Sequence, residues 1–312
     1  MPALPLKTAI GSYGHTRLLK DGSISSEKVA FEWVEISPIV DVFRRMVRGL
    51  EFDVSEMALS TYLCAKAYGK RMTAIPVFPL RGFHQGAIVY NTRSGIKSPH
   101  DLIGRKVGVR AYTVTTGVWL RGILKNVYGV DPDNLTWVLA SDEHVAEYML
   151  PPNVVSAPQG NDLKAMLISG EIDAAIGVGN IDSSHVELLI PDARRASIEH
   201  FQQTGIYPIN HTIVIKDELI EANPWLPEEL FSLFKAAKDS YIRLLASGGR
   251  LDSPDEAIMQ LGKIVGNDPL PYGIESNRKT LEAFIAFNVD QQIIPRTVDV
   301  EELFASSTLA LE

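Results

Sequence analysis

The 312-residue chain contains one cysteine, Cys64, and this scarcity excludes two kinds of site. No disulfide can form within the chain, because a second cysteine is missing. A zinc site that depends on several cysteine thiolates is excluded for the same reason. A chain that does without disulfides agrees with a reducing compartment, so we expect a cytoplasmic protein.

The chain also lacks the patterns of membrane and nucleic-acid proteins. No apolar run approaches the roughly 20 residues that a membrane-spanning helix needs. The first residues enter a strand pattern at once, without the charged, apolar and small-residue order of a secretory signal, which again favours the cytoplasm. The 30 Lys and Arg residues are scattered and are outnumbered by 38 Asp and Glu, which gives a net charge of −8. We therefore expect neither a membrane nor a nucleic-acid partner.

Familiar catalytic and cofactor motifs are missing as well. The glycine-containing loop at residues 11–14 (G-S-Y-G) lacks the spacing of a dinucleotide-binding loop or a P-loop. The patterns G-x-S-x-G and H-E-x-x-H do not occur. We expect no cofactor and no metal, although His15, Glu56, His84 and His211 could approach one another in space as metal ligands do.

What the chain does contain is a regular alternation of strand and helix patterns. Strands are predicted at residues 6–10, 29–36 and 52–57, and a helix at 58–68. Another predicted helix has Val40, Phe43, Val47 and Leu50 on one face. Such alternation predicts an α/β fold with mainly parallel sheets and crossover helices.

A short repeated phrase indicates two lobes of similar build. Residues 51–54 (E-F-D-V) and 171–174 (E-I-D-A) each follow a helix pattern that ends at a glycine. The strand-forming segments 86–90 and 211–215 flank the second half and are candidates for the two strands that join the lobes. We therefore expect a first lobe from residues 1–86, a second lobe from 87–210, and a return to the first lobe over 211–312. Helices at 228–245 and 276–288, with a short one within 252–267, are expected on the first lobe.

A candidate anion seat lies between a predicted strand at 106–110 and the helix that follows it. The helix shows Leu120, Ile123, Leu124 and Val127 on one face, and Thr113 is placed to cap its start. A helix start offers unpaired N–H groups and a partial positive charge. Residues 112–116 are therefore predicted to hold a carboxylate or phosphate.

Six blocks of sequence carry a family resemblance that runs along nearly the whole chain. They are D-V-S-E-M at 53–57, P-V-F-P-L-R at 76–81, V-G-V-R at 107–110, V-W-L-R-G-I-L at 118–124, Y-P-I-N-H at 207–211 and P-Y-G at 271–273. With these blocks the chain resembles the 4,5-dihydroxyphthalate decarboxylase family, which has the type II periplasmic-binding-protein fold. The resemblance implies two α/β lobes that close on a ligand at a two-strand hinge. It also implies a cytoplasmic enzyme of aromatic catabolism that decarboxylates 4,5-dihydroxyphthalate or a close analogue in the interlobe cleft.

The expected reaction needs a proton donor near the ring carbon that bears the carboxylate. His15, His84 and His211 are candidates, since histidine titrates near neutral pH and each lies in a loop or at a strand end. Glu56, at a strand end, could orient a histidine, act as the acid, contact a phenol hydroxyl, or merely pair with an arginine. The other histidines, at positions 100, 144, 185 and 200, are expected to be solvated.

Carboxylate binding is assigned to arginines, because a guanidinium presents paired donors. Arg17, Arg81 and Arg110 are the candidates, whereas Arg121 lies on a helix body and is expected to be solvated, and Trp119 is expected in the core. After Arg81 the chain has F-H-Q at 83–85 where the family pattern leads us to expect a second basic residue. The proposed polar lining consists of Ser12, Tyr13, Ser60, Tyr112, Thr115 and Thr116, and Ser60 could equally cap a helix.

Two functions from different classes stay open at this point. The first is a cofactor-independent decarboxylase of a hydroxylated aromatic diacid, and the alternative is a non-catalytic solute-binding protein for an aromatic anion. One fold can host both, so release of carbon dioxide is the observation that separates them. Either way the expected partner is a small aromatic carboxylate, and a homo-oligomer is compatible with the sequence.

Overall fold

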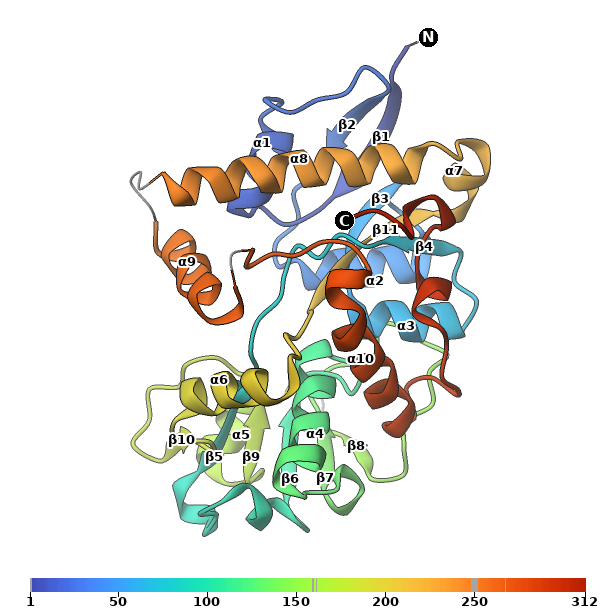
Figure 1. Ribbon diagram of the computed structural model, residues 1–312. Helices are drawn as coiled ribbons and strands as arrows, with labels where there is room; N and C mark the ends of the chain where they lie inside the picture. Colours follow the sequence, from blue (N-terminus) through green and yellow to red (C-terminus); the bar gives the residue numbers. More distant parts are fainter. Residues whose placement is uncertain (1, 159, 161, 248–251, 267) are drawn as a thin grey trace. The chain divides into compact units, whose positions relative to one another are not determined.

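The computed structural model describes residues 2–158, 160, 162–247, 252–266 and 268–312. They form two α/β units, each with its own sheet (Figure 1). Unit 1 contains the residues up to Arg81 together with Ile209–Glu282 and Val298–Glu312. Unit 2 contains Gly82–Pro208 and Ala283–Thr297.

The sheet of unit 1 has the strand order β2-β1-β3-β11-β4. Its strands are β1 (Leu4–Ala9), β2 (Val29–Trp33), β3 (Val54–Ala58), β4 (Met72–Ile75) and β11 (His211–Lys216). Strand β1 is parallel to β2 and β3, whereas β11 is antiparallel to both β3 and β4. Strands β1 to β4 therefore share one direction, and β11 opposes them.

The sheet of unit 2 has the order β10-β5-β9-β6-β7-β8. Its strands are β5 (Ile88–Asn91), β6 (Lys106–Val109), β7 (Thr136–Leu139), β8 (Val154–Ser156), β9 (Ala174–Ile176) and β10 (Val186–Leu188). Here β5 is antiparallel to both of its neighbours, and the other described pairs are parallel. In each unit, the reversed strand is the first one after the chain enters from the other unit, β5 after Arg81 and β11 after Pro208. These are the segments whose strand-forming pattern the sequence placed at 86–90 and 211–215.

Helices flank both sheets. Unit 1 holds α1 (Arg17–Lys20), α2 (Val40–Gly49), α3 (Leu59–Ala67), α7 (Asp217–Ala222), α8 (Leu226–Ala246) and α9 (Ser253–Val265), and unit 2 holds α4 (Thr115–Tyr128), α5 (Leu163–Ser169) and α6 (Ala193–Thr204). The boundary between the units falls inside α10 (Arg278–Asp290). Short 3₁₀ turns complete the described structure: η1 (Gly14–Thr16), η2 (Gln85–Ala87), η3 (Thr92–Ser94), η4 (Pro99–Leu102), η5 (Pro132–Asn134), η6 (Glu275–Asn277), η7 (Val300–Leu303) and η8 (Ser306–Thr308).

The repeated phrase of the sequence has the same structural role in both units. In unit 1, the carboxylate of Asp53 accepts a hydrogen bond of 2.9 Å from the Lys7 N–H, and the Asp53 N–H donates to the Lys7 carbonyl. In unit 2, Asp173 makes the same pair of contacts with Lys106, at 3.0 Å for the carboxylate. Each aspartate thus fixes the start of one strand against its parallel neighbour.

Helix α8 covers one face of the unit 1 sheet (Figure 1). Its buried side chains Leu230, Phe234 and Ala237 lie in one cluster with Val54 and Ile213 of the sheet. Burial of each large apolar side chain contributes about 1.5–3 kcal/mol. This packing also determines where η1 lies, because the ring of Tyr241 on α8 contacts that turn.

Several details differ from the sequence expectations. Helix α4 is preceded by Val114 as N-cap rather than by Thr113, and Val127 is 47% exposed instead of lying on a buried face. The predicted strand at 29–36 ends at Trp33. Helix α9 ends at Val265, and the predicted end of that helix at residue 267 lies outside the described residues.

Helix α10 corrects a further expectation. The sequence placed the helix at 276–288 on the first lobe, but its second half belongs to unit 2, where Phe284 stacks on Trp119 with ring centroids 4.6 Å apart. Periodicity can indicate a helix, but it does not say which of two cores the helix packs against. Across the residues that the structure describes, no helix combines the length and the apolar character needed to span a membrane.

Candidate active site

Glu56 is a fully buried carboxylate in the middle of the unit 1 sheet. Strand β3 pairs with β11 so that Ala58 faces His211 and Glu56 faces Ile213. In an antiparallel pair this register places Glu56 and His211 diagonally on the same face, within reach of long side chains. The His211 Nδ1 and the Glu56 Oε1 make a short hydrogen bond.

The loop after β1 brings two more donors to the same carboxylate. Strand β1 is the parallel neighbour of β3, so the loop that follows its carboxyl end lies beside Glu56. The Gly11 N–H donates to the Glu56 Oε2 at 2.7 Å, and the Tyr13 hydroxyl donates to the Oε1 at 2.7 Å. A Cβ at Gly11 would lie 2.6 Å from the Tyr13 ring, so this position requires glycine for the ring to fold back over the loop.

These contacts keep Glu56 ionised. Burial raises the pKa of its carboxyl, but hydrogen bonds and charge from His211, Tyr13 and Gly11 outweigh burial, and the net direction is below the ordinary value. Burial and the neighbouring Glu56 charge raise the pKa of Tyr13, so the phenol keeps its proton and acts as a donor. An anionic Glu56 is the partner of the His211 Nδ1, so the Nε2 is the ring nitrogen that lies outside this contact.

His15 lies directly against this network. Its ring stacks on Tyr13, with centroids 5.2 Å apart and an interplanar angle of 3°, and Tyr241 covers it from α8. Burial lowers the pKa of His15 to about 4, although Glu56 and the Pro79 carbonyl act in the opposite direction. Within the described part of the chain, its Nε2 has no hydrogen-bond partner. A neutral imidazole with one open nitrogen can accept a proton.

Close packing holds His15 in place through Gly14. A Cβ at Gly14 would lie 2.2 Å from the Tyr241 ring, so only glycine lets η1 approach α8 this closely. The Tyr241 hydroxyl in turn donates to the Asp255 carboxylate at 2.7 Å. The position of His15 therefore depends on α8 and α9 as well as on its own loop.

Arg17 and Ser12 lie at the rim of a cavity of about 300 Å³ in unit 1, together with Tyr13, Lys20 and Asp21. Arg17 is 62% exposed in its side chain and approaches Asp252 at 3.9 Å. Lys20, which sequence reasoning missed, is more enclosed: its Nζ donates to the Ile10 carbonyl and the Ser12 hydroxyl, each at 2.9 Å, and to the Glu35 carboxylate at 2.7 Å. Its spacing of three residues from Arg17 on α1 was the available signal, because residues i and i+3 of a helix share a face.

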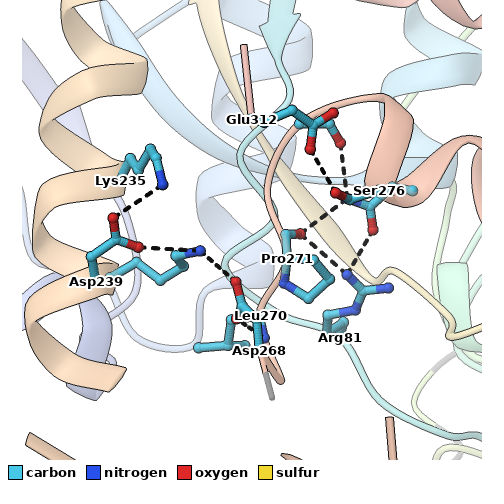
Figure 2. A network of polar contacts seen from close by, with 11 residues as sticks. Arg81, Lys235, Asp239, Asp268, Leu270, Pro271, Ser276 and Glu312 are labelled. Atoms are coloured by element: carbon cyan, nitrogen blue, oxygen red, sulfur yellow. Dashed lines mark hydrogen bonds and ion pairs between the residues drawn. The ribbon is translucent and has the colours of Figure 1, made fainter. Parts of the chain in front are cut away.

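Arg81 is buried, and one end of its guanidinium makes hydrogen bonds to a segment that is distant in the sequence, at residues 271–277. Its Nη1 donates to the Asn277 Oδ1 at 2.7 Å and to the Pro271 carbonyl at 3.3 Å, the latter drawn in Figure 2. The Asn277 side chain also donates to the Gly273 carbonyl at 2.8 Å. If Arg81 binds a carboxylate of the substrate, it does so with a guanidinium that already supports the segment at residues 271–277. Ser60, the remaining unit 1 candidate, is buried inside α3 and does not cap the helix.

A second charged cluster in Figure 2 lies beside these residues. Lys238 on α8 is buried and contacts Asp268 at 2.6 Å and Asp239 at 3.4 Å, and Lys235 contacts Asp239 at 3.0 Å. The positive charge of Lys238 is one of the causes that lower the pKa of His15, after burial. The pKa of His15 therefore depends on a charged residue of α8.

The unit 2 candidates lie at strand and helix ends of their own sheet. His84 is buried and lines a cavity of about 620 Å³ together with Thr116 and the turn Gly177–Gly179 after β9. Arg110 follows β6, and its Nη1 lies 3.3 Å from the Nε2 of His144. His144 is buried beside Arg110, which corrects the expectation that it is solvated.

The predicted anion seat is partly filled by a carboxylate of the protein itself. The N–H groups of Tyr112 and Thr113 both donate to Glu143, the latter at 3.1 Å. Tyr112 is buried, while Thr115 and Thr116 form the first turn of α4. Glu143 was missed, although its position shortly after β7, a parallel neighbour of β6, was a usable signal.

Arg121 is fully buried, against the expectation of a solvated side chain. Its Nη2 donates to the Tyr112 carbonyl at 2.6 Å and its Nε to the Gln291 side chain at 2.6 Å. Trp119 is in the core as expected. The described His, Cys, Asp and Glu side chains include no group of three that could hold a metal ion.

The fold and its two sheets define the class of protein. The structure is similar to that of the periplasmic aliphatic sulphonate-binding protein of Escherichia coli, with a TM-score of 0.56 and 17% identity over 99% of both chains. It is also similar to the alkanesulfonate-binding protein of Xanthomonas axonopodis pv. citri (TM-score 0.53, 14% identity, 97% of this chain and 99% of that one). A desulfurization enzyme shares the fold as well (TM-score 0.56, 13% identity, 99% and 98%). The chain therefore has the two-lobed type II periplasmic-binding-protein fold, which hosts binding proteins and enzymes.

Sequence relatives give the family. The chain is 30% identical to the 4,5-dihydroxyphthalate decarboxylase of Comamonas testosteroni, over 99% of this chain and 98% of that protein. It is 35% identical to the 4,5-dihydroxyphthalate decarboxylase of Pseudomonas putida, over 57% of this chain and 71% of that protein. No protein-family model matches the chain. The chain belongs to the 4,5-dihydroxyphthalate decarboxylase family, whose members named here are carboxy-lyases.

Proposed function

We propose that this protein removes one carboxylate, as carbon dioxide, from 4,5-dihydroxyphthalate or a close analogue. The observation that carries the proposal is the buried Glu56, which binds His211, Tyr13 and Gly11 at once in a chain of this family. A fully buried carboxylate with an imidazole on it is poorly explained by packing alone, because burial of a charge is unfavourable.

The substrate itself makes a cofactor unnecessary. In 4,5-dihydroxyphthalate a hydroxyl group lies para to each carboxylate, so the ring can take up the charge of a proton added at the carbon that bears the carboxylate. The C–C bond to the carboxylate then breaks, its electron pair restores the aromatic ring, and carbon dioxide leaves. One proton is consumed, and the other product is 3,4-dihydroxybenzoate.

His211 is the proposed proton donor to the ring. Its Nδ1 makes a hydrogen bond with the ionised Glu56, which orients the ring and leaves the Nε2 for the substrate. Glu56 is then a positioning and electrostatic partner and not the acid, because its contacts lower its pKa. His15, neutral and with its Nε2 open among the described residues, is the proposed hydrogen-bond acceptor for a hydroxyl of the substrate.

Carboxylate binding is proposed for the two cations at the unit 1 cavity, Arg17 and Lys20. Arg81 and Arg110, which the sequence also indicated, and the α4 residues Thr115 and Thr116 stay predictions for the same role. His84 stays a prediction as a proton-transfer residue. We also propose a cytoplasmic location, which agrees with the single cysteine and is tested by cell fractionation.

The test is decarboxylation by the purified protein without added cofactor, in wild type and matched variants. Glu56→Gln and His211→Gln should each lower kcat by about a hundredfold or more, the range of general acid–base contributions. The matched controls are Glu51→Gln, a partly exposed carboxylate paired with Arg45 and Lys7, and His185→Gln, an exposed imidazole, and both should stay within about twofold of wild type.

Two results would count against the proposal. A folded Glu56→Gln variant with the full rate would remove Glu56 from the chemistry. Tight binding of 4,5-dihydroxyphthalate by wild type, with the compound recovered unchanged after long incubation, would instead identify a solute-binding protein.

A further inference from the structure

Arg121 is a buried cation that has no carboxylate in direct contact among the described residues. Its side chain runs back along α4 towards the start of the helix, so a Cβ at Gly117 would lie 3.1 Å from its Nη1. That Nη1 has no hydrogen-bond partner within the described chain. A buried charge is normally compensated by a counterion, and an arginine keeps its charge in proteins.

The guanidinium is compensated through a peptide group that has Arg121 on one side and Glu143 on the other. The carbonyl of Tyr112 accepts a hydrogen bond from the Arg121 Nη2 at 2.6 Å. The N–H of the same peptide group belongs to Thr113 and donates to the Glu143 Oε2 at 3.1 Å. The Thr113 hydroxyl and the Tyr112 N–H also donate to Glu143. Because hydrogen bonds in series polarise one another, the guanidinium and the carboxylate hold this peptide more firmly than either would alone.

Aromatic and amide groups complete the surroundings of the guanidinium. It lies 4.0 Å from the ring centroid of Tyr112 and 5.1 Å from that of Trp137, both buried. Its Nε donates to the Gln291 Oε1 at 2.6 Å, and the Gln291 Nε2 donates to the Val118 carbonyl at 2.9 Å. Arg121 is thus fixed from four directions, and the turn before α4 is fixed with it.

This turn leads directly into the predicted carboxylate-binding residues. Helix α4 begins at Thr115, two residues after Thr113, and its N-cap Val114 has no side chain that can satisfy the first-turn N–H groups. Thr116 in that turn lines the cavity of about 620 Å³. The positive charge of Arg121 adds to the positive end of the helix dipole. Two positive charges close together are unfavourable in the ligand-free protein, and a bound anion relieves this repulsion.

We propose that Arg121 and Glu143 are positioning residues that hold the Tyr112–Thr113 peptide, so that the first turn of α4 can bind a carboxylate of the substrate. This inference rests on the proposed function for the identity of the substrate. It assigns Arg121 and Glu143 to binding and not to proton transfer. Loss of either should therefore weaken substrate binding more than it slows the chemical step.

Three variants and one matched control test the inference. Arg121→Met removes the guanidinium, Glu143→Gln removes the opposing charge, and Thr113→Val removes one hydroxyl contact at nearly constant volume. Lys125→Met is the control, since Lys125 lies one turn further along α4 and pairs at the surface with Asp290 at 3.1 Å. We expect the KM for 4,5-dihydroxyphthalate to rise about tenfold or more in the first two variants and about threefold in Thr113→Val, with kcat within about twofold. The control should match wild type in both constants.

A binding measurement separates this inference from the proposed function. Calorimetry with phthalate, which has both carboxylates but no hydroxyl to assist decarboxylation, should show the same order of weakening across the variants. If wild type binds phthalate but does not release carbon dioxide from 4,5-dihydroxyphthalate, the weakening still supports the positioning role while the proposed function fails. If wild type is active and the folded variants keep its KM and phthalate affinity, the positioning role is overturned and the function stands.

The inference can still be tested if one of the variants does not fold. If Arg121→Met does not fold, Glu143→Gln and Thr113→Val decide, because both keep the shape of the side chain they replace. A fall in kcat at unchanged KM in these variants would overturn the inference as well, since it would move the residues into the chemical step.

Discussion

At Glu56 a single, fully buried carboxylate accepts three hydrogen bonds. The Tyr13 hydroxyl is one of the contacts that hold its pKa down, so Tyr13→Phe should raise that pKa. The acidic limb of the profile of kcat/KM against pH should then move to higher pH, with a rate loss of about tenfold at neutral pH. Steady-state kinetics across pH measures this, and an acidic limb that stays in place would show that Glu56 does not control it.

His15 should make the stability of the protein depend on pH. Its folded pKa is about 4, below the ordinary 6.5, because burial disfavours the charged form. The unfolded chain therefore binds a proton that the folded protein does not, and stability falls as pH drops from about 6.5 towards 4. Between pH 7 and 4.5, urea unfolding of wild type should lose about 2 to 3 kcal/mol more than that of His15→Gln. Parallel losses in the two proteins would contradict a neutral, buried His15.

For single residues, the sequence predicted where in the fold they lie but not which side chains they contact. Glu56 and His211 were placed at strand ends, which is enough to select them as candidates. Their pairing depends on the β3–β11 register, which no local pattern specifies. Arg121 shows the opposite limit: a charged residue on a helix is usually solvated, and only the tertiary structure reveals that Tyr112, Trp137 and Gln291 enclose it.

Among the elements, the approach of η1 to α8 determines where the candidate histidine lies. Gly14→Ala would place a Cβ 2.2 Å from the Tyr241 ring, so either the turn or the ring must move. Strain of this kind destabilises by about 1–3 kcal/mol. Gly49→Ala at the end of α2 meets no atom within 4 Å and should be neutral or slightly stabilising. Thermal unfolding of both variants measures the contrast, and equal midpoints would mean that η1 tolerates displacement.

The order of strands and helices could be predicted well, but helix ends could not. The 51–54 and 171–174 phrases do enter strands β3 and β9, each anchored by its aspartate on a lysine backbone. The start of α4 was misjudged because the Thr113 hydroxyl, a good capping group, is bound to Glu143 instead. A residue cannot be assigned as a cap from its type when a distant carboxylate competes for it.

For the whole molecule, unit 2 is completed by a late segment of the chain. Residues Ala283–Thr297 belong to it, and Phe284 of α10 stacks on Trp119 of α4. Phe284→Ala should destabilise the protein by about 3–5 kcal/mol through the cavity it leaves. Hydrogen exchange should then show a larger loss of protection in β6 and α4 than in β1 and β3. Equal losses in both sheets would show that Phe284 does not serve unit 2 in particular.

The central claim concerns the whole protein, namely that it is a decarboxylase acting by ring protonation. The most direct measurement is incubation of the purified wild-type protein with 4,5-dihydroxyphthalate in D₂O without added cofactor, followed by mass and NMR analysis of the products. We predict one carbon dioxide for each 3,4-dihydroxybenzoate, with one deuterium on the ring carbon that carried the lost carboxylate. Recovery of 4,5-dihydroxyphthalate unchanged, or a product without deuterium at that carbon, would contradict the account.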